Sequence, residues 1–350
     1  MNPQKRTYFV KKKHLFFMLL TLLFAQKTKT LRVVLDGKIF KVPRNLINWP
    51  IPYWPHFPEK NIKDPKQRIS SDPYITADTF RNFCDHIVDE TNVLFDPSTV
   101  ETGDTIYTRT HSLDFFFEYL HPHIKSPYIL VTHFSDLPIP GKYYPYLDDK
   151  KLVAWFGINV VLKHKKLYPL PVGLTNNFYS FIRCPRNTTI SETIDSILHK
   201  FSCDRPEKRH LLLLPSLGDT HIERKKVKEI FSTKEFCKKA EKKPFKEYLE
   251  DMAYCKFILS PQGIGLDCHR TWEALLMGCI PIVSSSPIDN LFDDLPVLII
   301  QNWNQITKKF LEEKYMEMSQ KKYNLEKIYI YYWLDKIKEV QTAYRNKEGK

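Results

Sequence analysis

The stretch SPQGIGLDCHRTWEALLMGCIPIV, Ser260–Val283, decides the fold and carries most of the candidate site. It follows the apolar run KFILS and ends in IPIV, and both runs are typical of buried strands. Between them, two glycines form a loop, and a helix is predicted from Asp267 or Cys268 to Gly278. A strand, loop, helix and strand in this order indicate a parallel sheet with a right-handed crossover. The loop and the start of the helix then lie at the carboxyl edge of the sheet, where α/β proteins bind ligands.

Short apolar runs separated by polar connections continue in both halves of the chain. The first half contains DTIYT, YILVTH, LVAWFGINVV and LYPLPVGL, and the second contains HLLLLPS, KFILS, IPIV and PVLII. Helical patterns lie between them, including one that starts near Thr76 and extends through residue 90. RVVLDGKIFKV, with Asp36 and Gly37 at its centre, predicts a β-hairpin. This alternation predicts an α/β protein with two domains, over 31–205 and 206–350, after a basic segment at 1–30.

The net charge of +13 is unevenly distributed. Residues 1–30 contribute +7 and hold no acidic residue, so the remaining chain is only mildly basic and no nucleic-acid partner is expected. The basic residues flank the apolar run Leu15–Ala25, whose eleven residues fall short of the roughly 20 that span a bilayer comfortably. We expect an uncleaved signal anchor with a cytoplasmic N-terminus. The body would then lie in the Golgi or endoplasmic reticulum lumen of a eukaryote, or in a bacterial cell envelope.

Other sequence features are compatible with export but do not require it. Asn187 begins NTT, an acceptor triplet for glycosylation. The seven cysteines show no zinc spacing, and their odd number leaves at least one thiol unpaired within the chain. His121 and His123 in HPH lack a third ligand nearby, so they indicate a metal site only weakly.

The predicted helix after the glycine loop offers groups that suit a nucleotide. Its N-terminal N–H groups favour an anion, and the fork of donors on Arg270 matches phosphate oxygens. Glu273, one turn later, suits ribose hydroxyls, while Trp272 lies on the opposite face and is expected in the core. The alternative is structural, with Arg270 and Glu273 as an ion pair and the glycines as a tight turn.

Competing site motifs are missing from the sequence. Cys268 stands where the dinucleotide-binding fingerprint needs its third glycine, and no P-loop, HExxH or GxSxG occurs. No two aspartates stand two positions apart, so the chain lacks the DxD with which many glycosyltransferases hold a metal-bound nucleotide. We therefore expect a site without a metal and without a separate cofactor.

YCKFILSPQGIGLDCHRTWEALLMGCIPIVSSS, followed by LPVLIIQNW, resembles the C-terminal nucleotide-sugar domain of exostosin-like (GT47-type) glycosyltransferases. GDTIYTRT, YILVTHFSD and AWFGINVVLKHKKLYPLPVGL resemble the N-terminal half of these proteins more loosely. The resemblance implies a GT-B fold, with two facing Rossmann-like domains. It places Arg270 at the diphosphate and Glu273 at the ribose or uracil side. Its remaining donor-binding positions are Ser260, Gly263, Gly265, Asp267 and His269.

In a GT-B enzyme the acceptor lies on the N-terminal domain, across the cleft from the donor. If transfer inverts the anomeric centre, a base must take the proton of the acceptor hydroxyl. His133 and Asp136 follow a predicted strand and are the candidate bases, and Asn159 and Asn176 are further candidates for acceptor contacts.

The resulting hypothesis is a hexosyl- or pentosyltransferase that moves one sugar from a nucleoside-diphosphate sugar, UDP-linked, to a hydroxyl of a glycan or other acceptor. The alternative is a non-catalytic glycan or polyanion binder of the same fold. Such a binder would use the basic stretch ERKKVKEIFSTKEFCKKAEKKPFK. The glutamates that alternate with its lysines, such as Glu223, are more typical of a solvated helix.

Overall fold

The computed structural model describes residues 8–9, 30–35, 38–43, 68–89, 91, 95–184, 188–204 and 206–348. The chain divides into two units, Met1–Lys60 and Asn61–Lys350. In the first unit, β1 (Tyr8–Phe9), β2 (Thr30–Leu35) and β3 (Lys38–Pro43) form a sheet. β2 and β3 pair antiparallel with Leu35 opposite Lys38, which confirms the predicted hairpin.

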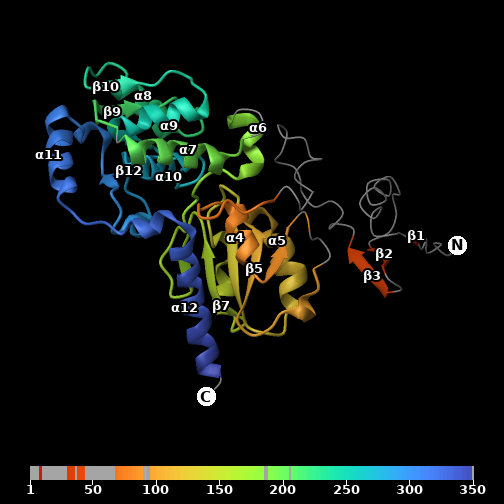
Figure 1. The fold of residues 1–350 in the computed structure, drawn as a ribbon. Coiled ribbons are helices and arrows are strands. Elements are labelled where there is room, and N and C mark those ends of the chain that lie inside the picture. Colours follow the sequence, from red (N-terminus) through yellow and green to blue (C-terminus); the bar gives the residue numbers. More distant parts are fainter. Residues whose placement is uncertain are drawn as a thin grey trace. The chain divides into compact units, whose positions relative to one another are not determined.

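The second unit begins with a parallel sheet whose strands lie in chain order (Figure 1). They are β4 (His86–Val88), β5 (Asp104–Arg109), β6 (Tyr128–His133), β7 (Leu152–Gly157) and β8 (Leu167–Pro169). Every residue of β5 and β6 is buried, as expected for central strands of a sheet covered on both faces. Helical turns connect these strands: η3 (Pro97–Thr99), η4 (Thr110–Ser112), α5 (Leu113–Phe115), η5 (Phe116–Leu120), η6 (His121–His123) and η7 (Gly141–Asp148).

The helix predicted from Thr76 onward is shorter than its sequence pattern indicated. α4 (Ala77–Phe83) starts where expected, because the Thr76 side chain accepts a hydrogen bond from Thr79 N at 3.0 Å. The chain leaves the helix after Phe83, and β4 pairs with β5 instead. The β-branched side chains of Ile87 and Val88 suit a strand, and pairing in the sheet overrides the helical periodicity.

A second parallel sheet follows, with strand order β10, β9, β11, β12, β13. Its strands are β9 (His210–Leu214), β10 (Cys237–Lys239), β11 (Cys255–Leu259), β12 (Ile280–Ser284) and β13 (Leu298–Ile300). The helices of this half are α6 (Ser180–Arg183), α7 (Ile190–Cys203), α8 (Ile222–Phe231), α9 (Phe245–Ala253), α10 (His269–Leu276), α11 (Lys308–Ser319) and α12 (Ile330–Glu348). Short 3-10 turns complete it at η8 (Asn177–Tyr179), η9 (Asp289–Phe292), η10 (Trp303–Gln305) and η11 (Leu325–Ile328). Two parallel sheets with connecting helices confirm the predicted α/β fold class with two sheet-containing halves.

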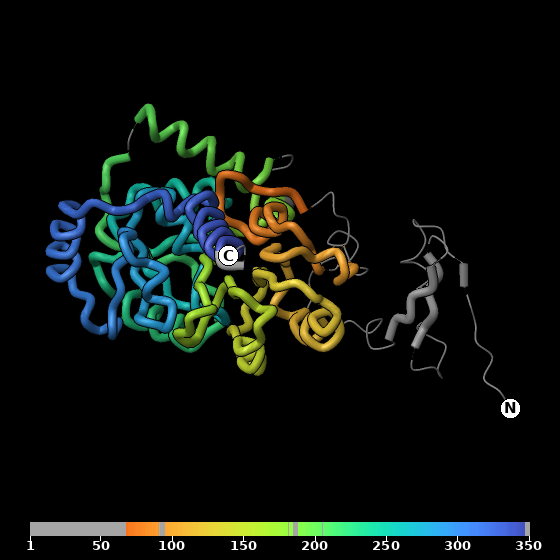
Figure 2. Tube along the Cα trace, turned by 90° about the horizontal axis from the view of Figure 1, so that it is seen from below, coloured from red at the N-terminus to blue at the C-terminus, as the bar shows by residue number. Residues whose placement is uncertain are grey.

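The last helix packs against the first half of the second unit, next to the β4–β8 sheet. α12 contacts α4 and β7, and in Figure 2 it is seen nearly end-on. Ile330 N donates to Pro73 O at 3.0 Å, and Gln341 Nε2 donates to Gly103 O at 2.8 Å. The C-terminal end of the chain is thereby fixed to the N-terminal half of the second unit.

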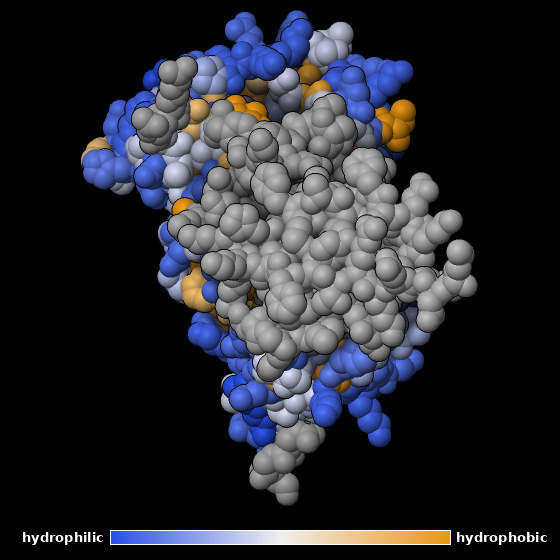
Figure 3. Space-filling model, turned by 90° about the vertical axis from the view of Figure 1, so that its right-hand side faces the viewer, coloured by the Kyte–Doolittle hydropathy of each residue, from blue (hydrophilic) through white to orange (hydrophobic). Residues whose placement is uncertain are grey.

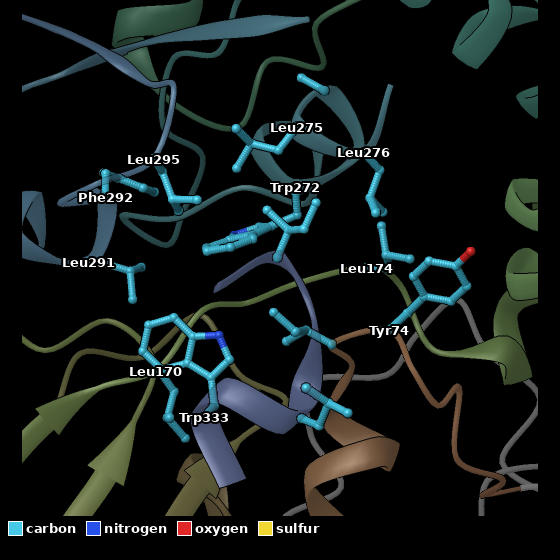
Figure 4. Close-up of a cluster of buried hydrophobic side chains, with 14 of the residues drawn as sticks. Tyr74, Leu170, Leu174, Trp272, Leu275, Leu276, Leu291, Phe292, Leu295 and Trp333 are labelled. Atoms are coloured by element: carbon cyan, nitrogen blue, oxygen red, sulfur yellow. The ribbon is translucent and has the colours of Figure 1, made fainter. Parts of the chain in front are cut away.

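One hydrophobic cluster contains residues from both sheets of the second unit. Figure 4 shows Trp272, Leu275 and Leu276 of α10 in this cluster with Leu170 and Leu174. Trp272 is 2% exposed, and its Nε1 donates to Asp267 Oδ2 at 2.7 Å. The indole is therefore a core residue, as its position on the helix predicted. On the face drawn in Figure 3, the coloured surface is mainly hydrophilic, with small apolar groups.

The expected single-pass membrane localisation is not supported and is corrected here. No helix among the described residues has both the length and the hydropathy needed to cross a bilayer. The run at 15–25 that motivated the anchor, and Asn187 with its triplet start, lie outside the described residues. All seven cysteines are free thiols.

Candidate functional site

A cavity of about 440 Å³ lies beyond the carboxyl ends of strands from both sheets of the second unit. Asp136 follows β6, Val172 follows β8, and the loops after β9, β10 and β11 supply most of the remaining wall. The cavity is therefore at the edge where the sequence predicted a ligand.

The glycine loop after β11 lines this cavity at Gly263 and Gly265. A Cβ at position 263 would lie 2.7 Å from Arg224 Nη2, and one at position 265 would lie 3.0 Å from the amide of Asn159. The glycines thus allow the backbone to approach two side chains closely. Asn159, predicted as an acceptor contact, instead accepts a hydrogen bond from Leu266 N at 2.9 Å and holds this loop.

The start of α10 is open toward the cavity. Its N-cap residue, Cys268, makes no side-chain capping bond to the helix, and Cys268, His269 and Arg270 all line the cavity. Arg270 is half-buried, and its Nη1 is buried without a hydrogen-bond partner among the described residues. An unpaired guanidinium nitrogen beside an uncapped helix start favours an anionic ligand.

Glu273 lines the same cavity but is 2% exposed and already paired. Its Oε1 accepts a hydrogen bond from Arg183 Nη2 at 2.8 Å, and Arg183 Nη1 donates to Thr175 Oγ1 at 2.7 Å. The ion pair therefore joins Glu273 to Arg183 of α6, 90 positions away along the chain. Sequence reasoning missed Arg183, because it lies in a stretch without strand or helix periodicity.

Tyr248 of α9 also lines the cavity, and no sequence motif indicated it. Burial raises the pKa of its hydroxyl, and the charge of Glu273 raises it further, while Arg270 and Arg183 act in the opposite direction. The tyrosine therefore stays protonated and offers an O–H group next to both arginines.

Asp267 is 8% exposed and lies at the cavity wall. Its carboxylate accepts hydrogen bonds from Val172 N at 2.8 Å, Trp272 Nε1 at 2.7 Å and Cys268 N at 2.7 Å. Burial raises the pKa of Asp267 to about 6, against the effect of these three donors. Its side chain thus connects the glycine loop, α10 and the segment that follows β8.

Ser260 and His269, the remaining predicted donor contacts, differ in position. Ser260 is 2% exposed and is not part of the cavity wall, because its Oγ lies 3.0 Å from Thr271 Oγ1 beneath the loop. His269 lines the cavity, and its Nδ1 lies 2.8 Å from Gly173 O. Because a carbonyl only accepts, Nδ1 carries the proton and Nε2 is left as an acceptor.

The two candidate bases also separate. His133 is 1% exposed, with Nε2 donating to Pro171 O at 3.0 Å and Nδ1 accepting from Phe134 N at 2.8 Å. Burial lowers its pKa to about 4, so both ring nitrogens serve the fold and the predicted role as base is corrected. Asp136 is exposed and lines the cavity.

The other polar candidates have structural partners. The amide of Asn176 is buried and accepts from Asp78 N at 3.1 Å. His121 contacts the Tyr128 hydroxyl at 2.8 Å and Asp149 at 3.0 Å. In the part of the chain that is described, no three His, Cys, Asp or Glu side chains converge as metal ligands would.

Comparison with known proteins finds one family model that matches part of the second unit. Residues 216–344 match the family described as "RXYLT1 C-terminal domain". No curated protein sequence matches the chain.

Two solved structures resemble the chain at a low level. The "Crystal structure of GtfA/B complex" has 13% identity and a TM-score of 0.34, over 69% of this chain and 58% of that one. The UDP-GlcNAc 2-epimerase from Methanocaldococcus jannaschii has 11% identity and a TM-score of 0.31, over 63% and 71%. At these scores neither likeness transfers a site or an activity. The family match over residues 216–344 supports the resemblance to exostosin-like, GT47-type proteins that the Ser260–Val283 motif indicated.

Proposed function

We propose that this protein is a glycosyltransferase that moves a pentose from a UDP-linked donor to a hydroxyl group of a glycan or other acceptor. The observation that carries the proposal is the buried, unpaired Nη1 of Arg270 at the open start of α10, in a cavity that the family-matched domain helps to line. The matched family's name refers to a xylosyltransferase, and this favours a pentose donor. The preference for uridine rests on the exostosin resemblance.

In this proposal the diphosphate lies against Arg270 and the N–H groups at the start of α10. These groups stabilise the negative charge that develops as the nucleotide leaves, which lowers the barrier to transfer. Glu273, fixed by Arg183, accepts hydrogen bonds from ribose hydroxyls through its second oxygen. The guanidinium and the helix start supply the positive charge, so we propose that no divalent metal is required.

The acceptor hydroxyl approaches from the side of the first sheet, where Asp136 lines the cavity. Its exposed carboxylate takes the proton as the hydroxyl attacks the sugar. Transfer then inverts the anomeric centre, and the nucleoside diphosphate leaves toward Arg270.

The test is thermal unfolding of the full chain with UDP, GDP and their sugars, beside Arg270→Ala and the matched surface variant Arg209→Ala. A ligand at 100 times its Kd stabilises the folded state by about 2.7 kcal/mol. We expect UDP to raise the midpoint of the native chain and of Arg209→Ala, but not of Arg270→Ala. Nucleotide binding that survives in Arg270→Ala would refute the assignment of the diphosphate. A native chain that binds no nucleotide but binds glycans in a salt-dependent way would favour the non-catalytic alternative.

A further inference from the structure

Two neighbouring residues of α8, Glu223 and Arg224, hold one residue of the glycine loop, Gln262, through its backbone N–H and C=O. Gln262 N donates to Glu223 Oε2 at 3.0 Å, and Arg224 Nε donates to Gln262 O at 2.9 Å. A backbone donor and acceptor of the same residue are therefore fixed by opposite charges on adjacent side chains. Charge-assisted bonds of this kind are stronger than neutral ones, so the loop is held in one position.

The other oxygen of Glu223 extends this connection. Its Oε1 accepts from Ser284 Oγ at 2.5 Å and from Trp303 Nε1 at 2.8 Å. Glu223 therefore links the loop after β11 to the end of β12 and to η10. The sequence pattern had suggested a solvated helix, but only residues such as Lys225 and Glu229 on α8 are exposed in that way.

Arg224 also reaches the part of the cavity at the start of α10. It lines the cavity, and its Nη2 lies 3.6 Å from Sγ of Cys268, the N-cap of α10. The same nitrogen occupies space that a Cβ at Gly263 would need. One of its nitrogens is thus bound to the loop carbonyl, while the rest of the guanidinium lies beside the helix start that Arg270 also flanks.

We infer that Arg224 is a second anion-binding guanidinium of this cavity, and that Glu223 is the positioning residue that sets the loop and Arg224 together. This inference rests on the proposed function. In it, α8 contacts the diphosphate of the donor through Arg224. Two guanidinium groups suit a diphosphate better than one, because a diphosphate carries more than one negative charge at neutral pH. A bound anion also locks the glycine loop, since Arg224 bonds to both.

The first test compares UDP with uridine, which lacks the phosphates, on the full chain. By calorimetry, Arg224→Ala is expected to weaken UDP binding about 10- to 100-fold, as for the loss of a hydrogen bond to a charged group. Uridine binding should not change. Arg224→Lys should lose an intermediate amount, because an ammonium group cannot bond to Gln262 O and the anion as a planar fork does. Lys225→Gln, which removes an exposed charge from the same helix, is the matched control.

Two readouts separate an anion contact from a merely structural role. The salt dependence of UDP affinity should become shallower in Arg224→Ala, because one screened charge contact is lost. Glu223→Gln, with Glu229→Gln as its control, should weaken UDP binding less than Arg224→Ala does. The double variant Glu223→Gln/Arg224→Ala should lose less UDP affinity than the sum of the two single losses. Glu223 acts through the Arg224 guanidinium, which is already absent in Arg224→Ala.

The outcomes distinguish this inference from the proposed function. If the native chain binds UDP through Arg270 but Arg224→Ala and Arg224→Lys bind it equally well, the inference is wrong and the proposed function stands. If both Arg224 variants lose UDP and uridine in parallel, the residue is structural only. If the native chain binds no nucleotide, both proposals are wrong.

Discussion

The two parallel sheets of the second unit have the same number of strands, yet their carboxyl edges differ in chemistry. The edge of the C-terminal sheet carries Arg224 and Arg270 on the cavity wall. At the edge of the N-terminal sheet, Arg109 is 8% exposed and its guanidinium lies 4.7 Å from the ring centre of Phe134, while His133 is fully enclosed. If the proposed function holds, one sheet carries the ligand-binding groups, and the other forms a wall on which Asp136 is an exposed acid.

The glycine loop and α10 connect these two regions directly. Leu266 N bonds to Asn159, Asp267 accepts from Val172 N, and His269 contacts Gly173 O. The residues that shape the proposed donor site therefore also hold the N-terminal half in place. Variants can separate the two roles, because some affect only ligand-facing atoms and others only the connections.

The largest expected effect belongs to Asp136. Asp136→Asn should reduce kcat by roughly 10²- to 10⁴-fold, the usual contribution of general base catalysis, and leave the Kd for UDP unchanged. Asp148→Asn, another exposed aspartate of the N-terminal half, is the control. Steady-state transfer and UDP binding are measured on the same preparations. Full activity in Asp136→Asn would remove the N-terminal sheet's only assigned role in the chemistry.

A smaller effect is expected from the ion pair between Glu273 and Arg183. Glu273→Gln should raise the KM for the donor. It should also lower the free energy of unfolding by about 1–3 kcal/mol, because the half-buried guanidinium of Arg183 loses its carboxylate partner. Glu250→Gln breaks the surface pair with Lys200 and should destabilise the fold less, because water screens exposed pairs. Denaturant titrations give the two free energies. Equal losses in both variants would mean that the wall of the cavity is no more sensitive than the surface.

The smallest net effect is a pH dependence in which the two regions oppose each other. His133 has an ordinary pKa of 6.5 and a folded value of about 4, so the unfolded chain binds the extra proton between these values and stability falls as pH falls. Asp267 has an ordinary pKa of 3.8 and a folded value of about 6, so here the folded chain binds the extra proton and stability rises as pH falls.

Urea titrations between pH 4 and 7 check these signs. His133→Gln should lose less stability on acidification than the native chain, and Asp267→Asn should lose more. Identical pH profiles for both variants would show that neither buried group has the shifted pKa that its surroundings imply.

The sequence predicted the parts of the molecule that depend on local pattern. Most strands of both sheets were expected, as was the helix after the glycine loop. α10 (His269–Leu276) begins and ends within two residues of the expected start at Asp267 or Cys268 and the expected end at Gly278. Their apolar runs are bounded by turn residues, so neighbours in the chain determine them. β4 and β10 were missed, because β4 continues a helical pattern and β10 reads CKK, and only pairing in a sheet makes them strands.

The candidate site was predictable only where its residues are close in sequence. Arg270 and the glycines lie on the cavity wall, whereas the partner of Glu273 is 90 positions away and Glu223 was taken for a surface charge. His133 is the last residue of β6, but a local pattern cannot show that its ring donates a hydrogen bond to Pro171 O. Burial and distant partners decide these roles, and neither is visible in a single stretch of residues.

The central claim is that the nucleotide binds through the C-terminal sheet alone, while the N-terminal sheet contributes to transfer. Calorimetric binding of UDP to the full-length native chain, Arg270→Ala and Asp136→Asn tests this in one series. The account predicts that Arg270→Ala loses at least about 100-fold in affinity, from two lost bonds to a charged group, and that Asp136→Asn binds UDP like the native chain. Equal losses in both variants, or unchanged binding in Arg270→Ala, would contradict it.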